Sequence, residues 1–298
     1  MKAAMAWPDK YDPQERLPRV TISASAEIAV ARDGAEIYFE SYGHGPALLA
    51  IGGVPGGASE YRKPGPLLGQ HFRFLAYDRR GTLRSTGRPD HDMDMEQQCD
   101  DIIAVLDTVN EESVIVFSAC AGGSIAFELA MRHPSRVSAV IAHEPPFFEL
   151  LPDPEEVMQF CRQLCTPDSV ADPTAAVIKW MDRMGDPDRP PLPYDLVRQR
   201  AEVDGSYILE HEFMPMITYS PDIERLRNSE IPIVMTIGEG SREHNLEYAR
   251  TVPILVDLLG CQMKTFPGYH SPFRNRPEEF AESLTETIGI VVGGKQSR

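Results

Sequence analysis

One cysteine lies where the sequence most readily supports chemistry. Cys120 follows the apolar run 114–117 and precedes small residues that lead into an amphipathic helical pattern near 125–130. A side chain on such a sharp strand-to-helix turn is lifted above the end of a sheet, and only small neighbours tolerate the strained backbone. The thiolate form of cysteine is the attacking species, and the positive end of the following helix favours that charge. The pattern therefore predicts a nucleophilic thiol at Cys120.

Strands alternating with helices must position this thiol. The segment 26–42 alternates polar and apolar residues around Asp33 and Gly34, which favours a hairpin of two antiparallel strands. Short apolar runs that predict further strands occupy 47–51, 72–77, 114–117, 137–142 and 231–237. Helical periodicities separate several of these runs. Continuous apolar strands alternating with helices indicate an α/β protein with a mostly parallel sheet that is covered on both faces.

The alternation is interrupted between Phe147 and Asn228, where Pro, Asp and Met accumulate and no strand pattern is evident. We expect a helical cap inserted at 147–226, with a core made of 1–146 and 227–298. Aromatic and methionine side chains in this insertion could wall an apolar pocket, or they could simply form the core of the cap. The predicted substrate-binding residues are Gly53, Phe147, Phe148, Trp180 and Tyr219.

Charge and length limit the classes of partner. The 298 residues include 45 acidic and 29 basic side chains, and the formal net charge of -16 disfavours binding to nucleic acid or to an anionic membrane. The segment 1–17 lacks the apolar stretch of a signal peptide, and no run of about 18 apolar residues is found. We therefore expect a cytoplasmic enzyme with a small-molecule substrate, and leave a homodimer open.

The remaining cysteines predict no disulfide framework. Five cysteines are scattered through a large chain, and their odd number indicates reduced thiols. Cys161 and Cys165 are spaced to share a helix face and hold a metal, but no second ligand pair with metal-site spacing accompanies them. We expect no metal and no cofactor.

The turn at Cys120 resembles the nucleophile elbow of the α/β-hydrolase superfamily. That elbow is written G-x-S-x-G, and residues 118–122 are S-x-C-x-G, with cysteine in place of serine. Dienelactone hydrolases and polyester synthases of this superfamily use cysteine at this point. The resemblance implies an α/β-hydrolase fold with Cys120 as the nucleophile of acyl transfer. The alternative is a buried thiol in an inactive relative.

The same resemblance also implies which residue is the general base. Residues 267–270 are similar to the P-G-x-H turn that precedes a P-E-E-F helix, so His270 is expected to be the general base, with His143 and His244 as competitors. The closing helix is expected over 277–292.

The chain departs from the usual pattern at the triad acid, the carboxylate that would orient His270. The customary aspartate position, in the loop 238–243, holds Gly240 or Ser241. Haloalkane dehalogenases instead place the acid at the end of the strand after the nucleophile helix, where this chain has Glu144. Glu144 is therefore the first choice, Glu239 the second and Glu243 the third. The alternative for Glu144 is a structural role at the mouth of the cap.

Two backbone N–H groups are expected to hold the oxyanion that forms when a carbonyl is attacked. Ala121 is one donor, and Val54 is the other, in a loop 52–57 that resembles H-G-x-P-G but has Gly52 in place of histidine. This loop lacks the phosphate-binding patterns of nucleotide sites. Residues 78–81 resemble the D-x-R-G turn of the same superfamily and are expected to brace loops.

These residues together predict a cysteine-dependent hydrolase. His270 is expected to deprotonate Cys120, and the thiolate to attack an ester, lactone or thioester of a small apolar molecule. Water then releases the acid from an acyl-thioester intermediate. An acyltransferase or cyclase that uses the same site is one alternative. A non-catalytic ligand-binding or sensor protein on a hydrolase scaffold is the other.

Overall fold

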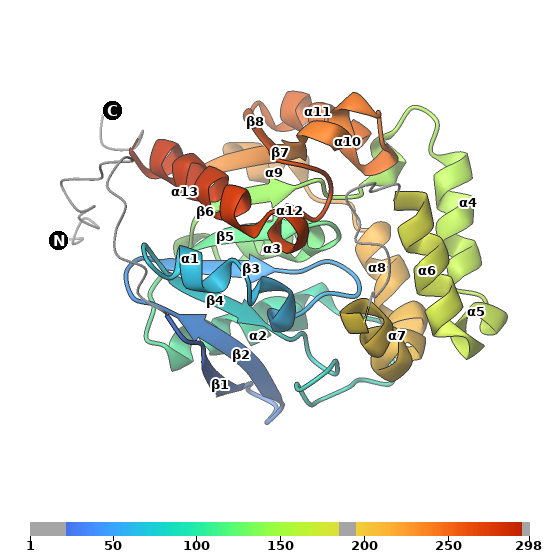
Figure 1. Ribbon diagram of the computed structural model, residues 1–298, viewed down its shortest axis with the longest axis horizontal. Coiled ribbons are helices and arrows are strands. Elements are labelled where there is room, and N and C mark those ends of the chain that lie inside the picture. Colours follow the sequence, from blue (N-terminus) through green and yellow to red (C-terminus); the bar gives the residue numbers. More distant parts are fainter. Residues whose placement is uncertain (1–21, 185–194, 294–298) are drawn as a thin grey trace.

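A single mixed sheet forms the centre of the protein. The structure, a computed structural model, describes residues 22–184 and 195–293. Its strands are arranged in the order β1-β2-β4-β3-β5-β6-β7-β8 (Figure 1). Their bounds are Ser25–Val30, Glu36–Tyr42, Ala47–Ile51, Arg73–Tyr77, Val114–Ala119, Val137–His143, Ile233–Gly238 and Gln262–Phe266, for β1 to β8 in turn.

The sheet is mostly parallel, as the sequence predicts. The first strand pairs antiparallel with β2, and β2 pairs antiparallel with β4. The pairings from β4 and β3 through β8 are all parallel. The predicted hairpin turns at Gly34, whose φ of +87° lies in the left-handed region that glycine tolerates. The two strands of this hairpin extend the parallel sheet at one edge.

Helices cover both faces of the sheet. The helices of the core are η1 (Ala58–Tyr61), α1 (Gly65–Leu68), α2 (Met95–Thr108), α3 (Gly122–Arg132), η2 (Pro134–Arg136), α10 (Glu239–Glu243), α11 (Glu247–Leu259), α12 (Pro272–Asn275) and α13 (Pro277–Gly293). Every residue of β3 is buried, because successive side chains enter opposite clusters. Leu49 belongs to a cluster that includes residues of α2, α3 and α11, and Leu48 belongs to a second cluster that includes residues of α1 and α13. Two apolar cores, one on each face of the sheet, thus hold in place the strands whose carboxyl ends carry the candidate site.

A run of helices follows β6. It consists of η3 (Phe148–Leu150), α4 (Glu155–Leu164), α5 (Pro167–Ala171), α6 (Pro173–Met184), α7 (Asp195–Tyr207), the π-helical turn η4 (Ile208–Glu212), α8 (Phe213–Ile217) and α9 (Ile223–Asn228). We call the described part of 147–226 the cap segment. Its helices α4 to α8 gather beside one end of the sheet (Figure 1), and its described residues contain no strand.

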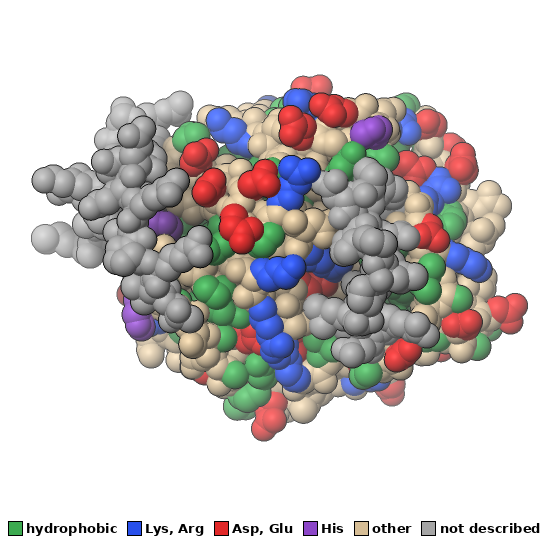
Figure 2. Space-filling view, in the orientation of Figure 1, with side chains coloured by type: hydrophobic (Ala, Val, Ile, Leu, Met, Phe, Trp, Pro, Cys, Tyr) green, Lys and Arg blue, Asp and Glu red, His purple; other side chains and the backbone are tan. Residues whose placement is uncertain are grey.

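Many arginine side chains form ion pairs with acidic side chains. Basic side chains lie close to acidic ones on the face drawn in Figure 2. Arg62 binds Glu40 at 2.7 Å, and Arg84 binds Asp78 at 2.6 Å. None of the helices in the described part of the chain combines the length and the apolarity that crossing a membrane requires.

Candidate functional site

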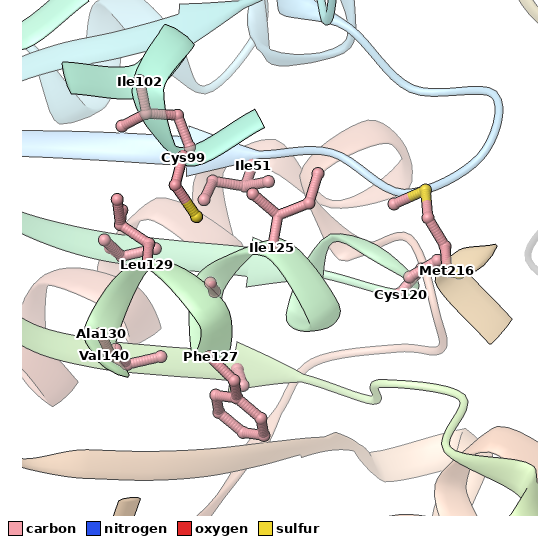
Figure 3. Packing of buried hydrophobic residues seen from close by; sticks show 14 of the residues in the cluster. Ile51, Cys99, Ile102, Cys120, Ile125, Phe127, Leu129, Ala130, Val140 and Met216 are labelled. Carbon is pink, nitrogen blue, oxygen red and sulfur yellow. The ribbon is translucent and has the colours of Figure 1, made fainter. Parts of the chain in front are cut away.

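Cys120 occupies the turn between β5 and α3. Its φ of +53° is left-handed, a conformation that costs a residue with a side chain on the order of 1–3 kcal/mol. The backbone compensates in part, because the Cys120 N–H donates to the His143 carbonyl at 3.0 Å and the Cys120 carbonyl accepts from Gly123 at 3.0 Å. The turn therefore fixes a thiol at the carboxyl end of the sheet. Figure 3 shows Cys120 and Met216 at the same end of the drawn cluster.

The small neighbours of Cys120 are required by close contacts. A Cβ on Gly122 would lie 2.4 Å from the Ile51 carbonyl oxygen, which forbids a side chain there. A Cβ on Gly53 would lie 2.5 Å from the Cys120 Cβ and 3.1 Å from its Sγ. The loop after β3 consequently passes directly against the thiol, and only glycine at 53 allows this approach.

Glu144 and His270 form a buried pair next to this turn. The Nδ1 atom of His270 lies 2.8 Å from Oε2 of Glu144. The other carboxylate oxygen of Glu144 accepts the Gly238 N–H at 2.8 Å, and the side chain is fully buried. Glu144 comes directly after β6 and has a φ of +48°. The ends of β6 and β7 thus hold the carboxylate in one orientation.

The Cys120 sulfur and the Glu144 carboxylate both raise the pKa of His270. Burial alone would lower the pKa of His270, but the charge on the Cys120 sulfur and then the Glu144 carboxylate raise this pKa to about 10. The Nε2 atom has no hydrogen-bond partner of normal geometry among the described residues. This nitrogen is therefore available for proton transfer.

Burial also opposes ionisation of Glu144. Desolvation would raise the pKa of this carboxyl group, but the hydrogen bond and the charge of His270, together with the Gly238 N–H, lower it. Glu144 is therefore a carboxylate near neutral pH, and a carboxylate stabilises an imidazolium.

His143, the last residue of β6, is fully buried next to the pair of Glu144 and His270. Burial lowers the pKa of His143 to about 4, so the ring is neutral. Its Nε2 lies 3.3 Å from the Tyr269 carbonyl, which only accepts, so Nε2 carries the hydrogen and Nδ1 accepts from Thr236 at 3.0 Å. The ring supports the residue before His270. From the sequence alone, His143 is expected only as a competing general base.

The other competitors are at the surface. His244 is exposed, and its Nδ1 lies 2.9 Å from the Gly240 carbonyl. Glu239 and Glu243 are also exposed, at the two ends of α10. The carboxylate that is hydrogen-bonded to His270 is that of Glu144.

The two predicted oxyanion donors flank the thiol. Ala121 is the N-cap residue of α3, where a helix leaves backbone N–H groups without partners. Val54 is half-buried in the loop that Gly53 presses against Cys120. Within the residues that the structure describes, neither N–H donates to a protein acceptor. Both are therefore available to a bound oxygen.

The predicted substrate-binding aromatics contact one another, other rings of the cap segment and α3. The Trp180 ring meets Phe148 at 6.3 Å and Phe213 at 5.2 Å, and both contacts are edge-on. Phe147 contacts the ring of Phe127 on α3. The hydroxyl of Tyr219 donates to Glu128, also on α3. The contacts of Phe148 and Trp180 fit the alternative in which these residues form the core of the cap segment, whereas Phe147 and Tyr219 connect the cap segment to α3. Contact of these residues with substrate stays a prediction.

A cavity of about 910 Å³ lies elsewhere. Its lining includes Arg73 at the start of β4 and Asn110 just after α2, together with Ser25 and Ser41. Cys120 follows the carboxyl end of β5, so this cavity is at the opposite end of the parallel strands. The volume of this cavity is therefore not the volume of a substrate site at Cys120.

Known proteins are similar to this chain in sequence and in fold. Residues 46–163 match the family described as alpha/beta hydrolase fold. An uncharacterized hydrolase, YraK, of Bacillus subtilis is 26% identical over 260 residues, 86% of this chain and 93% of that protein. The zearalenone hydrolase of Cladophialophora bantiana is 24% identical over 270 residues, 87% of this chain and 94% of that protein.

A solved structure, described as Est816, an N-acyl homoserine lactone degrading enzyme, superimposes with a TM-score of 0.71 at 20% identity. The match covers 87% of this chain and 99% of that one. The family match contains Glu144, the turn at Cys120 and the loop 52–57, which we call the oxyanion loop after its predicted role. Sheet order, sequence match and structural neighbour agree, and they confirm that this chain has the α/β-hydrolase fold.

Proposed function

We propose that the protein hydrolyses ester or lactone bonds with Cys120 as nucleophile, His270 as general base and Glu144 as the acid that orients His270. The observation that carries this proposal is the 2.8 Å contact between His270 Nδ1 and Glu144, beside a thiol on a left-handed turn. The zearalenone hydrolase and the lactone-degrading enzyme among the relatives support an ester or lactone substrate.

The reaction proceeds in two halves. The Cys120 proton passes to His270 Nε2, and the sulfur attacks the carbonyl carbon. The Val54 and Ala121 N–H groups hold the resulting oxyanion. When it collapses, the carbon–oxygen bond of the ester breaks and the alcohol leaves with the proton from His270. Water, deprotonated by His270, then attacks the thioester and releases the carboxylic acid and the thiol.

The cap segment completes the proposed site. We place residues 147–226 as a cap inserted in the core 1–146 and 227–298, with Gly53, Phe147, Phe148, Trp180 and Tyr219 toward a small apolar substrate. Phe148, Trp180 and Cys120 lie in the same apolar cluster, which supports a substrate side chain of low polarity.

The test is a panel of chromogenic esters, lactones and thioesters, followed by intact-protein mass and peptide mapping. We expect turnover of part of the panel and a transient acyl adduct on Cys120. Transfer of the acyl group to an added amine in preference to water would identify an acyltransferase instead. Tight binding without turnover of any member would contradict the enzyme proposal and favour a ligand-binding protein.

The titration of His270 tests the contact with the sulfur. Removing the sulfur in Cys120→Ala is expected to lower the pKa of His270 from its raised value, because the Cys120 charge is the largest influence that raises it. The proton on His270 stabilises the fold below the unfolded-state pKa of about 6.5, and this contribution is lost as pH rises through about 10. Imidazole ¹⁵N shifts measured from pH 5 to 11 would reveal the change. Equal midpoints in both proteins would show that the sulfur does not act on His270.

A further inference from the structure

Arg79 joins the oxyanion loop to the cap segment. Its Nη1 donates to the Gly53 carbonyl at 2.9 Å and to the Gly52 carbonyl at 3.3 Å. Its Nη2 donates to Oε2 of Glu212 at 2.8 Å. Glu212 ends the π-helical turn η4, and π-helical turns occur often at functional sites. One guanidinium therefore contacts both sides of the proposed substrate site.

Stability alone gives a weak reason for such a pair. Arg79 is 2% exposed and Glu212 is fully buried. Two charges taken out of water lose more solvation than a single contact readily restores. The Nε atom of Arg79 and the Oε1 atom of Glu212 also lack a hydrogen-bond partner among the described residues. A well-packed apolar pair would serve the fold as well, so the position of the guanidinium calls for another explanation.

The Gly53 carbonyl supplies that explanation. It belongs to the same planar peptide group as the Val54 N–H, so the two bonds point in opposite directions. A cation on the carbonyl fixes the direction of the N–H and makes it a stronger donor. Gly53 also lies against Cys120, so the fixed peptide is next to the reacting sulfur.

We propose that Arg79 is the positioning residue of the oxyanion hole, and that Glu212 makes this positioning depend on the seating of the cap segment. This inference rests on the proposed function. Arg79 orients the Val54 donor through the Gly53 carbonyl, and Glu212 holds the guanidinium in place. The cap segment, which is bound to Arg79 through Glu212, thereby completes the site that stabilises the oxyanion.

The experiment compares two reactions of the same thiol. Acylation of Cys120 by p-nitrophenyl acetate forms an oxyanion, whereas alkylation by iodoacetamide forms none. In Arg79→Lys we expect acylation to fall by about 10- to 100-fold, because a lysine ammonium lacks the fork that reaches both the carbonyl and Glu212. Alkylation should stay within about twofold of the wild-type rate, since it needs no donor. Glu212→Gln should lower acylation by about three- to tenfold.

Arg80→Lys is the matched control. Arg80 is also buried, but its Nε binds Asp101 at 2.9 Å and its Nη1 binds Asp33 at 2.7 Å, away from the oxyanion loop. We expect both reactions to be unchanged in this variant. The double variant Arg79→Gln with Glu212→Gln removes both charges together and replaces any single variant that fails to fold.

The outcomes are distinguishable. A parallel fall of acylation and alkylation would show that Arg79 only supports the fold, and unchanged acylation in both Arg79→Lys and the double variant would overturn the inference alone. A wild-type protein that is alkylated at Cys120 but never acylated, by this ester or by the wider panel, would overturn the proposed function and the inference with it.

Discussion

Cys120→Ala is expected to remove ester turnover almost completely, with kcat/KM reduced by about 10⁴- to 10⁶-fold. The reason is that the Cys120 sulfur follows β5 and acts directly on His270, so its removal takes away the nucleophile of the covalent half of the reaction. The Val54 and Ala121 donors remain in the variant and account for any residual rate. Initial rates with a chromogenic ester that the wild type hydrolyses would measure the loss.

The other cysteines provide the control for Cys120. Burial raises the pKa of Cys161 to about 12 and that of Cys165 to about 11, so both thiols resist ionisation. Cys261, whose pKa is also raised by burial, is half-buried, and Cys261→Ala should retain wild-type turnover. One equivalent of alkylating reagent should modify Cys120 and abolish turnover. Wild-type rates in Cys120→Ala would exclude the thiol as nucleophile.

The fold could be predicted because its pattern is local. The runs 47–51 and 114–117 are apolar throughout, and 137–142 is apolar except for the half-buried Ser138; all three are buried on both faces of the sheet, as parallel strands should be. The hairpin followed from Asp33 and Gly34. The strand β8 has a weaker pattern, because four of its five residues are exposed or half-buried at the edge of the sheet.

The candidate site was predictable in part. Cys120 and Glu144 each follow a buried strand, and parallel strands bring their carboxyl ends together at one edge. The sequence left Glu144 and Glu239 as competing acids, because both follow strands, β6 and β7. Only the fold distinguishes them, since it buries Glu144 against His270 and turns Glu239 to solvent.

Contacts between residues that are far apart in the sequence could not be predicted. Arg79 lies in a turn that the sequence predicted only to brace loops, and its partner Glu212 is 133 positions away in the cap segment. No periodicity or spacing links two such positions. The same applies to Trp180 and Phe213, whose composition suits either a pocket wall or a packed core. Tertiary packing decides between such alternatives.

The second large effect is expected for Glu144→Gln, with kcat reduced by about 10³- to 10⁴-fold and the fold retained. The glutamine oxygen can still accept the Gly238 N–H, so its NH₂ group is left facing His270 Nδ1. Because that NH₂ group only donates, Nδ1 must become the acceptor and the hydrogen moves to Nε2. The nitrogen that should take the thiol proton then already carries one, and the imidazolium loses its balancing charge. Steady-state rates and thermal unfolding of the purified variant measure the two effects separately.

Glu239→Gln and Glu243→Gln are the matched controls, because both carboxylates are exposed on α10 and neither is hydrogen-bonded to His270. Their kcat values are expected to stay within about twofold of wild type, as is usual for surface changes away from a site. The comparison also has a pH signature, since the loss in Glu144→Gln should ease at high pH, where hydroxide assists deprotonation of the thiol. A large loss in Glu239→Gln with normal turnover in Glu144→Gln would move the acid from the end of β6 to the end of β7, and the position of His270 would then have to change in the working enzyme.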